Sequence, residues 1–409
     1  MISILRMMLV CFTVSLPVWA QSANTTPASS EAPPVKALRA LYDADQGFRD
    51  TLDRALANVR DPDGPMANPW KGKTLDDLAA FFNDWFYLLP VNGGADDEFE
   101  YIKKFAWFYY RNEYGQRLVG QEPGLGWTKN FVAARGAFLD SQASTASIRQ
   151  WMADPGIAMD QYVVPPGGFQ SFNEFFARDL KPGMRPIASL MDDAVLVAPT
   201  DCVLNMIDPL TPEARVAAKL GQKMDVKALL AGSAYAKHFE KGTSISCILL
   251  PHTYHHYHAV ASGRVVESRE DVAGAYWGIP DLHGFLNKGN IGYGQGYSVF
   301  EHFRRGYFII ETSDYGYVAM VPVGLDTVGS VVFEDKFRQV APFRPVPVAK
   351  GERMGHFAYG GSLVITLVEQ GMEGITIPQG QQMGVLRPKT PPAATGGPYS
   401  EVLPDPTNR

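Results

Sequence analysis

The chain has 409 residues, of which 46% are hydrophobic and 20% are charged, and its formal net charge is −6. This length and hydrophobic content predict a globular protein with more than one domain, and they exclude a chain that is disordered throughout. A negative net charge supplies no basic surface for nucleic acid, so we expect no nucleic-acid partner.

The first 36 residues have the pattern of an export signal followed by a flexible linker. Residues 1–20 contain Arg6, an apolar run over residues 7–19 and then Ala20, which together predict a signal peptide. An uncleaved anchor is the alternative. Residues 21–36 are rich in Ser, Thr and Pro and predict a flexible tether. We therefore expect an exported protein, periplasmic or extracellular, with an association to a membrane left open.

Residues 37–164 predict a helical domain. Apolar side chains recur at helical spacing over residues 38–56, and the turn-forming stretch 61–65 ends that stripe. Thr74, followed by acidic residues, is typical of a helix N-cap. The helix after it and a further helix over 98–114 are rich in aromatic residues. Because their polar faces carry few Lys and Arg, we expect the aromatic side chains to form a core and not to enter a membrane interface.

Residues 165–409 predict a β-rich domain, because short apolar runs separated by Gly and Pro replace the helical stripes. The strands that we expect cover residues 195–199, 244–251, 307–311, 318–323 and 363–368, and one helix is expected over 225–239. The fold class predicted for the whole chain is therefore α+β, with a helical N-terminal domain followed by a β-rich domain of mostly antiparallel or mixed sheet.

Cysteine usage leaves one open question. Cys11 lies in the signal segment, so only Cys202 and Cys247 remain in the mature chain. In an oxidising compartment these two residues could form a disulfide. We favour two buried thiols, since a sequence does not give the distance between them. No Cys or His spacing is typical of a zinc site.

Four stretches of the second domain carry polar residues that could take part in catalysis. They are Phe172–Ile187, Ala198–Cys202, Leu250–His258 and Gly355–Ile365. In the last of these, Ser362 directly follows Gly360 and Gly361. Paired glycines before a strand often form only a bulge or a turn. The same placement also leaves the Gly361 carbonyl open to attack by the Ser362 hydroxyl.

In this order the four stretches resemble the phosphatidylserine decarboxylase family of pyruvoyl-dependent enzymes. The family has an F-x-E-F-F-x-R-x-L-K-x-G-x-R-P-I block, a P-A-D-G block, a Y-H-R-x-H block and a G-S-T or G-G-S processing site. The resemblance covers about residues 165–388. Residues 37–150 are similar to the helical domain of some members, including relatives that decarboxylate free aromatic amino acids. The resemblance implies a catalytic domain over residues 165–409.

The resemblance also implies a role for each matching residue. Self-cleavage would occur between Gly361 and Ser362 and would convert Ser362 into a pyruvoyl group. This group would be the cofactor, because decarboxylation needs an electron sink that no ordinary side chain offers, and its ketone would form a Schiff base with the substrate amine. The base that activates Ser362 would be His258, oriented by Asp201. His255 would handle a proton during decarboxylation.

The histidine-rich stretch permits other interpretations. Residues 255 and 258 would leave an extended strand on opposite faces, so a shared pocket requires a turn or bulge there. Four of the eight histidines lie between residues 252 and 258, and such a cluster could bind a metal. No carboxylate or cysteine pattern accompanies the cluster, and the family implies no metal, so we expect none. We expect His252 and His256 at the surface or as supporting groups, and Asp201 without the resemblance would be an ordinary turn cap.

Three residues depart from the family pattern. Leu363 replaces the Ser or Thr after the processed serine, Cys202 replaces a Gly, and His256 replaces an Arg. These departures leave the extent of self-cleavage open, so a non-cleaving, catalytically dead binding relative is one alternative. The expected function is decarboxylation of phosphatidylserine to phosphatidylethanolamine, and decarboxylation of a free amino acid, aromatic ones included, is the other alternative. The expected partners are that substrate and a peripheral membrane contact, and the large and small chains are expected to stay associated.

Overall fold

The computed structural model describes residues 31–61, 68–91, 101, 104–105, 107–109, 112–217, 223–272, 303–325 and 331–371. The predicted signal peptide and most of the predicted tether lie outside these residues.

The first part of the described chain is helical, as predicted. Its α-helices are α1 (Pro33–Ala44), α2 (Gln46–Ala57), α3 (Leu75–Tyr87), α5 (Glu113–Gly120), α6 (Gly124–Leu139), α7 (Ile148–Met152) and α8 (Phe172–Phe176), and its 3₁₀ turns are η1 (Gln142–Ser147), η2 (Pro155–Ile157) and η3 (Met159–Gln161). The Thr74 cap is confirmed, because Thr74 and Asp77 form a reciprocal capping box at the start of α3.

Three helix boundaries differ from the prediction. α1 begins at Pro33, inside the predicted tether, because the fixed φ of proline suits the first helical turn. The predicted stripe over 38–56 is divided at Asp45, which is extended and whose carboxylate accepts from the Phe48 N–H to cap α2. The helix predicted over 98–114 does not reach its predicted end, because Asn112 is extended and caps α5.

The aromatic side chains of the helical part form its core, as expected. Phe82, Trp85, Phe105 and Phe131 are buried and contact one another at ring-centroid distances of 5.1–6.1 Å. No helix among the described residues is long and apolar enough to cross a membrane.

The second part is built on antiparallel sheets. Its strands are β1 (Val203–Pro209), β2 (Arg215–Ala217), β3 (Lys223–Asp225), β4 (Thr243–Leu249), β5 (His256–His258), β6 (Gly263–Val272), β7 (Arg305–Glu311), β8 (Tyr317–Leu325), β9 (Val331–Phe333), β10 (Val346–Val348), β11 (Arg353–Phe357) and β12 (Gly361–Val368). Described residues form a seven-stranded sheet in the order β1-β4-β12-β8-β7-β6-β10, a three-stranded sheet β5-β11-β9 and the pair β2-β3. Each described pair is antiparallel, which confirms the α+β fold class.

Two element predictions in this part are wrong. Residues 195–199 form no strand: Val197 makes a single backbone bond, to the Val260 carbonyl, and Pro199 has no N–H to donate. The helix predicted over 225–239 is interrupted, because Ala231 and Gly232 have φ of 51° and 80°. It is replaced by α9 (Val226–Leu229) and the 3₁₀ turn η4 (Ala234–Phe239); a further 3₁₀ turn, η7, covers Asp335–Phe337.

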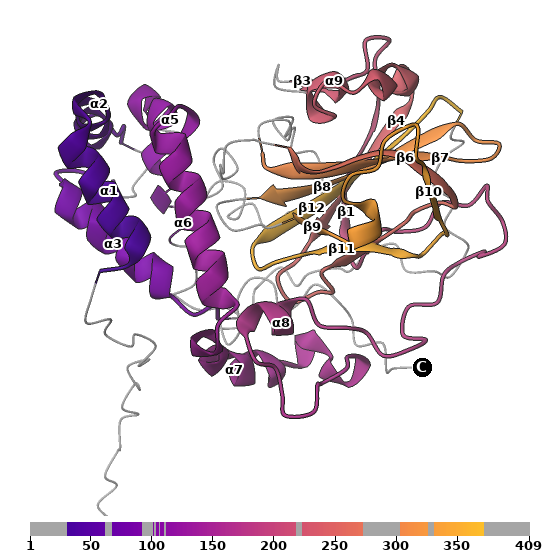
Figure 1. The fold of residues 1–409 in the computed structure, drawn as a ribbon, viewed down its shortest axis with the longest axis horizontal. Helices are drawn as coiled ribbons and strands as arrows, with labels where there is room; N and C mark the ends of the chain where they lie inside the picture. Colours follow the sequence, from indigo (N-terminus) through magenta and orange to yellow (C-terminus); the bar gives the residue numbers. More distant parts are fainter. Residues whose placement is uncertain are drawn as a thin grey trace, which may run out of the picture.

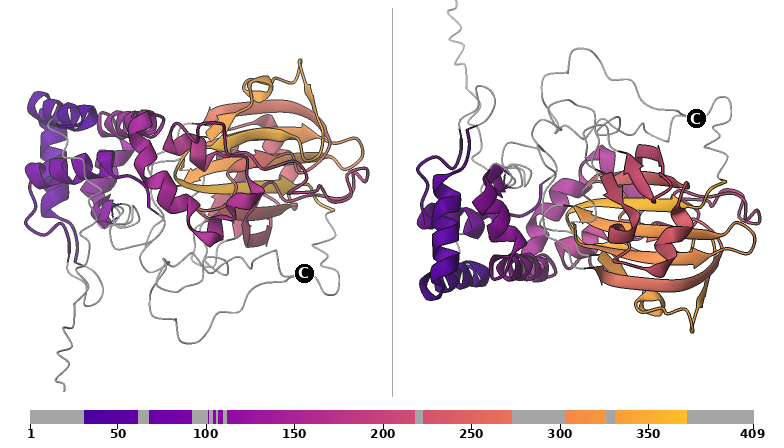
Figure 2. Two further views of the ribbon diagram at one scale, coloured as in Figure 1. Left: turned by 90° about the horizontal axis from the view of Figure 1, so that it is seen from below. Right: turned by 90° about the horizontal axis from the view of Figure 1, so that it is seen from above.

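The seven-stranded sheet separates two apolar clusters. On one face Leu363 and Ile365 of β12 belong to the same cluster as the aromatic residues of the helical part. On the other face Val364 packs with Tyr257 of β5, so this cluster lies between the two larger sheets. All three views place the helical part beside the sheets along the long axis, with α7 and α8 at the junction (Figures 1 and 2).

Candidate active site

Ser362 is the residue that the sequence predicts to be processed. It lies at the start of β12, a central strand, where it is opposite Leu249 of β4 and Gly324 of β8. Ser362 is 1% exposed, and its hydroxyl has no hydrogen-bond partner among the described residues. A buried hydroxyl without a partner costs free energy, so its presence indicates a functional site or a strained state.

The backbone conformation at the first of the two glycines before Ser362 explains why a glycine stands there. Gly360 has a φ of 149°, a backbone conformation that residues with a Cβ rarely adopt. Because residues alternate along a strand, the Ser362 side chain leaves β12 on the same face as Val364, toward the space between the two sheets. Leu363 leaves it on the opposite face.

His255 is the most deeply buried of the expected histidines. Its Nδ1 lies 2.9 Å from the Thr253 carbonyl, and its ring packs on Phe176 at a centroid distance of 3.8 Å. A carbonyl only accepts, so Nδ1 carries the proton and Nε2, which has no partner among the described residues, presents a lone pair. Burial, and then the charge of Arg178, hold the pKa of His255 well below its usual value.

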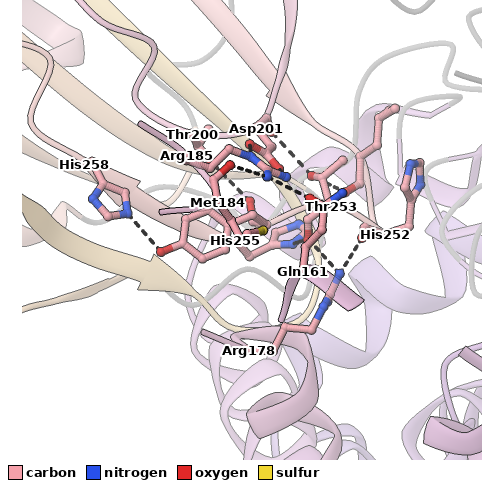
Figure 3. Close-up of polar contacts among 12 residues, drawn as sticks. Gln161, Arg178, Met184, Arg185, Thr200, Asp201, His252, Thr253, His255 and His258 are labelled. Atoms are coloured by element: carbon pink, nitrogen blue, oxygen red, sulfur yellow. Dashed lines mark hydrogen bonds and ion pairs between the residues drawn. The ribbon is translucent and has the colours of Figure 1, made fainter. Parts of the chain in front are cut away.

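His258 and Asp201 are not hydrogen-bonded to each other, contrary to the expected geometry. The His258 Nδ1 donates to the Gly351 carbonyl at 2.8 Å, and its Nε2 accepts from the Tyr254 hydroxyl at 2.9 Å. Asp201 instead accepts from Nε and Nη2 of Arg185 at 2.8 and 2.7 Å. In Figure 3 the His258 ring lies apart from the Asp201–Arg185 pair. A guanidinium that binds both carboxylate oxygens competes strongly with a single imidazole N–H, which explains this pairing.

His255 and His258 therefore have different surroundings. His258 packs near the Tyr254 ring, on which His256 stacks at a centroid distance of 5.1 Å, whereas His255 packs on Phe176. His256 donates from Nε2 to the Ala177 carbonyl at 2.7 Å, and burial is the main cause that lowers its pKa to about 4.

Two further expectations concern the same stretch. His252 and His256 are buried, so the expectation that they lie at the surface is wrong, and only their supporting role remains. Within the part of the chain that the structure describes, no three His, Cys, Asp or Glu side chains gather as a metal site would require.

Sequence reasoning missed Asn173 and Tyr359, which support the segment before Ser362. The Asn173 side-chain oxygen accepts from the Tyr359 N–H at 3.0 Å, and its amide donates to Asp140 of the α6 C-cap at 2.8 Å. The Tyr359 ring packs on Phe172 and Phe176. Both residues lie in the quoted stretches, but nothing in their spacing indicated that they meet.

Cys202 and Cys247 are thiols, as favoured, but only Cys247 is fully buried and Cys202 is half-buried. The hydrogen bond between the two thiols is the main cause that raises the pKa of Cys202, and burial adds to it. Cys202 directly follows Asp201, and Cys247 lies on β4.

Fold and site together define an α+β protein with a buried, unpartnered serine hydroxyl at the start of a central antiparallel strand. Residues 172–385, more than half of the chain, match the family model described as phosphatidylserine decarboxylase. The chain belongs to the phosphatidylserine decarboxylase family.

Curated relatives agree with this membership. A protein named phosphatidylserine decarboxylase proenzyme 2, from Oryza sativa subsp. japonica, is 30% identical over 244 residues, which are 59% of this chain and 36% of the relative. One named phosphatidylserine decarboxylase proenzyme 3, from Schizosaccharomyces pombe, is 28% identical over 66% of this chain and 26% of its own length. The phosphatidylserine decarboxylase proenzyme of Clostridium kluyveri is 29% identical over 59% of this chain and 75% of its own. The match thus spans about a third of the rice protein and a quarter of the fission yeast protein.

Proposed function

We propose that this chain is a pyruvoyl-dependent carboxy-lyase that decarboxylates phosphatidylserine to phosphatidylethanolamine. The observation that carries the proposal is the buried, unpartnered Ser362 hydroxyl directly after Gly360 and Gly361. The names of the relatives support both the substrate and the existence of an uncleaved precursor, since each is called a phosphatidylserine decarboxylase proenzyme.

The first step of this function is self-cleavage. The Ser362 oxygen attacks the Gly361 carbonyl carbon, and the Gly361–Ser362 amide becomes an ester as the nitrogen is protonated. Removal of the Ser362 α-proton breaks the Cβ–O bond and releases the Gly361 carboxylate. Water then replaces the nitrogen of the dehydroalanine, ammonia leaves, and a ketone remains at the new N-terminus. When formed, this pyruvoyl group supplies the electron sink that decarboxylation requires.

The fold suits both products of this cleavage. Ser362 is the second residue of β12, and from Ser362 to Val368 this strand is paired with β4 on one side and with β8 on the other. A cut before Ser362 leaves these two ladders in place, so the small chain stays bound to the large chain as a central strand.

The resemblance assigns the base for Ser362 to His258 with Asp201, and we retain this assignment in the proposal. In the described state His258 is bonded to Tyr254 and Gly351, and Asp201 is bonded to Arg185. Processing by this pair therefore requires both groups to leave their present partners. His255 has a free Nε2 and handles a proton in the decarboxylation step.

Export and a peripheral membrane contact complete the proposal. Export is supported by the pattern of residues 1–20, and membrane contact by a substrate that resides in a lipid bilayer.

Carbon dioxide release tests the function. The purified full chain is incubated with vesicles that contain phosphatidylserine and, separately, with free serine and free aromatic amino acids. We expect carbon dioxide from the vesicles only, and none from the Ser362→Ala variant. Release from a free amino acid alone would replace the proposed substrate. An uncut chain that releases nothing from any substrate would identify a binding relative.

A further inference from the structure

Arg178 is a buried cation without a carboxylate partner. It follows α8 and is 2% exposed, and it forms no ion pair among the described residues. Its guanidinium lies 4.1 Å from the centre of the Tyr162 ring and 5.0 Å from that of Phe175. Burying a charge without an anion costs several kcal/mol, on the order of the penalty for a broken buried ion pair.

Two hydrogen bonds of Arg178 reach the turn that precedes His255, while Nη1 donates to the Phe175 carbonyl at 3.4 Å. Nη2 donates to the His252 carbonyl at 2.6 Å and, in a longer contact, to the Thr253 carbonyl at 3.5 Å. The Thr253 carbonyl is also the acceptor for Nδ1 of His255 at 2.9 Å. The guanidinium and the imidazole therefore share one carbonyl, which is the acceptor that fixes the His255 tautomer (Figure 3).

The charge of Arg178 opposes the effect of the Thr253 carbonyl: the cation lowers the pKa of His255, as burial does more strongly, and the hydrogen bond to the carbonyl raises it. Among the charged and titratable groups that face His255, Arg178 carries a permanent positive charge, and the other two are the neighbouring His252 and His256. The α8 side chain that packs on the ring is Phe176, which carries no charge. From the surrounding elements, Tyr162 and Asp201 face Arg178, whereas Arg353 and His356 of β11 face His256. A cation beside an imidazole disfavours imidazolium.

We propose that Arg178 is a positioning residue that keeps His255 neutral, with its proton on Nδ1 and its Nε2 free to accept a proton. The link to decarboxylation rests on the function proposed above, whereas the protonation state of His255 does not. Arg178 itself touches no reacting atom in this account.

Two substitutions separate the charge of Arg178 from its hydrogen bonds. Arg178→Gln keeps a donor for the carbonyls and removes the charge, and Arg178→Lys keeps the charge and removes the planar fork. Arg135→Gln is the matched control. Arg135 is also buried, at 1% exposed, and its Nη1 donates to the carbonyls of Trp85, Phe86 and Leu88 in the helical part.

The first readout is the titration of the His255 ring by NMR of the full chain labelled with ¹⁵N-histidine, assigned with His255→Gln. The second is the pH dependence of carbon dioxide release from phosphatidylserine vesicles. We expect Arg178→Gln to raise the His255 titration midpoint and to move the acid limb of the rate profile upward in pH by the same amount, although burial still holds the pKa of His255 below its usual value. Arg178→Lys should lower the rate but leave the His255 titration midpoint and the acid limb of the rate profile at their wild-type positions. Arg135→Gln should lower thermal stability and change neither the midpoint nor the acid limb.

The inference would be overturned if Arg178→Gln lowers the rate by the same factor at every pH and leaves the His255 titration unchanged. If Arg178→Gln does not fold, a shifted His255 titration in the charge-retaining Arg178→Lys would overturn it as well. Wild-type protein that releases no carbon dioxide would contradict the proposed function, while the NMR titration would still decide the role of Arg178.

Discussion

At the residue scale, His255 and His258 differ in what each ring can do. His255 presents a free Nε2 in a buried site, whereas both nitrogens of His258 are engaged by Gly351 and Tyr254.

We expect His258→Ala to leave the chain uncut, because Ser362 loses its base. We expect His255→Ala to cleave and then to decarboxylate at least a hundredfold more slowly, since general acid–base groups contribute on this order. Denaturing gels and carbon dioxide release measure the two effects. An uncut His255→Ala chain beside a normally cut His258→Ala chain would mean that the two roles are exchanged.

His256 makes folding sensitive to acid. Its pKa is about 4 in the folded chain, mainly through burial, against 6.5 when exposed. The unfolded chain therefore binds the proton more readily, so the contribution to stability is complete above pH 6.5 and is lost as the pH falls toward 4. For this one group the loss between pH 7.5 and pH 5 is about 2 kcal/mol.

The His256 effect can be isolated by substitution. His256→Gln keeps a donor for the Ala177 carbonyl and cannot titrate, so urea unfolding at the two pH values should show a smaller acid-induced loss than in the wild type. Equal losses in the two proteins would contradict the assignment.

The sequence supplied the candidate residues of the site but not their contacts. The motif blocks point to Asp201, His255, His258 and Ser362. The motif blocks did not indicate that Arg185 binds Asp201. Arg185 and His258 can both donate to a carboxylate, and only the fold decides which of the two reaches Asp201.

At the scale of elements, β12 explains how the chain accommodates Leu363. Leu363 is fully buried on the face that packs with the helical part, opposite to the face of Ser362. We expect Leu363→Thr to lower the free energy of unfolding by about 2–4 kcal/mol, because it leaves a cavity and buries a hydroxyl. The extent of Gly361–Ser362 cleavage should not change, since the side chain points away from the serine.

Urea unfolding and denaturing gels test the Leu363 prediction together. Leu367→Thr, on the same face of the same strand, is the matched control and should show a similar loss of stability. A change in cleavage in Leu363→Thr that Leu367→Thr lacks would contradict this account of the strand.

The turn between β11 and β12 depends on Asn173. Its loss would leave the buried Tyr359 N–H without an acceptor and would release the segment that precedes Gly361. We expect Asn173→Ala to cost about 1–3 kcal/mol and to slow self-cleavage. Asn58→Ala, at an exposed helix C-cap, is the control and should affect neither property. Normal cleavage kinetics in Asn173→Ala would show that the turn forms without this bond.

Periodicity identified the long elements and failed where single residues determine the backbone. The apolar runs of β4, β7, β8 and β12 read as strands because both of their faces are buried. The end of the helix after Asp225 is a local turn, in which the Gly232 N–H donates to the Lys227 carbonyl at 2.7 Å, and the glycine that signals this end was overlooked.

At the scale of the whole molecule, the helical part is joined to the elements that support the serine. One continuous apolar cluster includes Trp85 of α3 and Ile365 of β12. Asn173 connects Asp140 at the end of α6 with Tyr359 just before Gly360 and Gly361. The helical part therefore packs against the elements that carry the candidate site. The sequence did not predict this contact, because the helical pattern of the first part and the strand pattern of the second do not show how the two parts pack.

The central claim is that the chain cuts itself before Ser362 and converts this residue into a ketone, and intact-mass spectrometry of the purified protein tests it most directly. The account predicts a large chain that ends at Gly361 and a small chain of residues 362–409 whose N-terminal residue is a pyruvoyl group that reacts with a carbonyl reagent. The Ser362→Ala variant should remain one uncut chain. A wild-type chain of uncut mass, with an ordinary serine at position 362, would contradict the account.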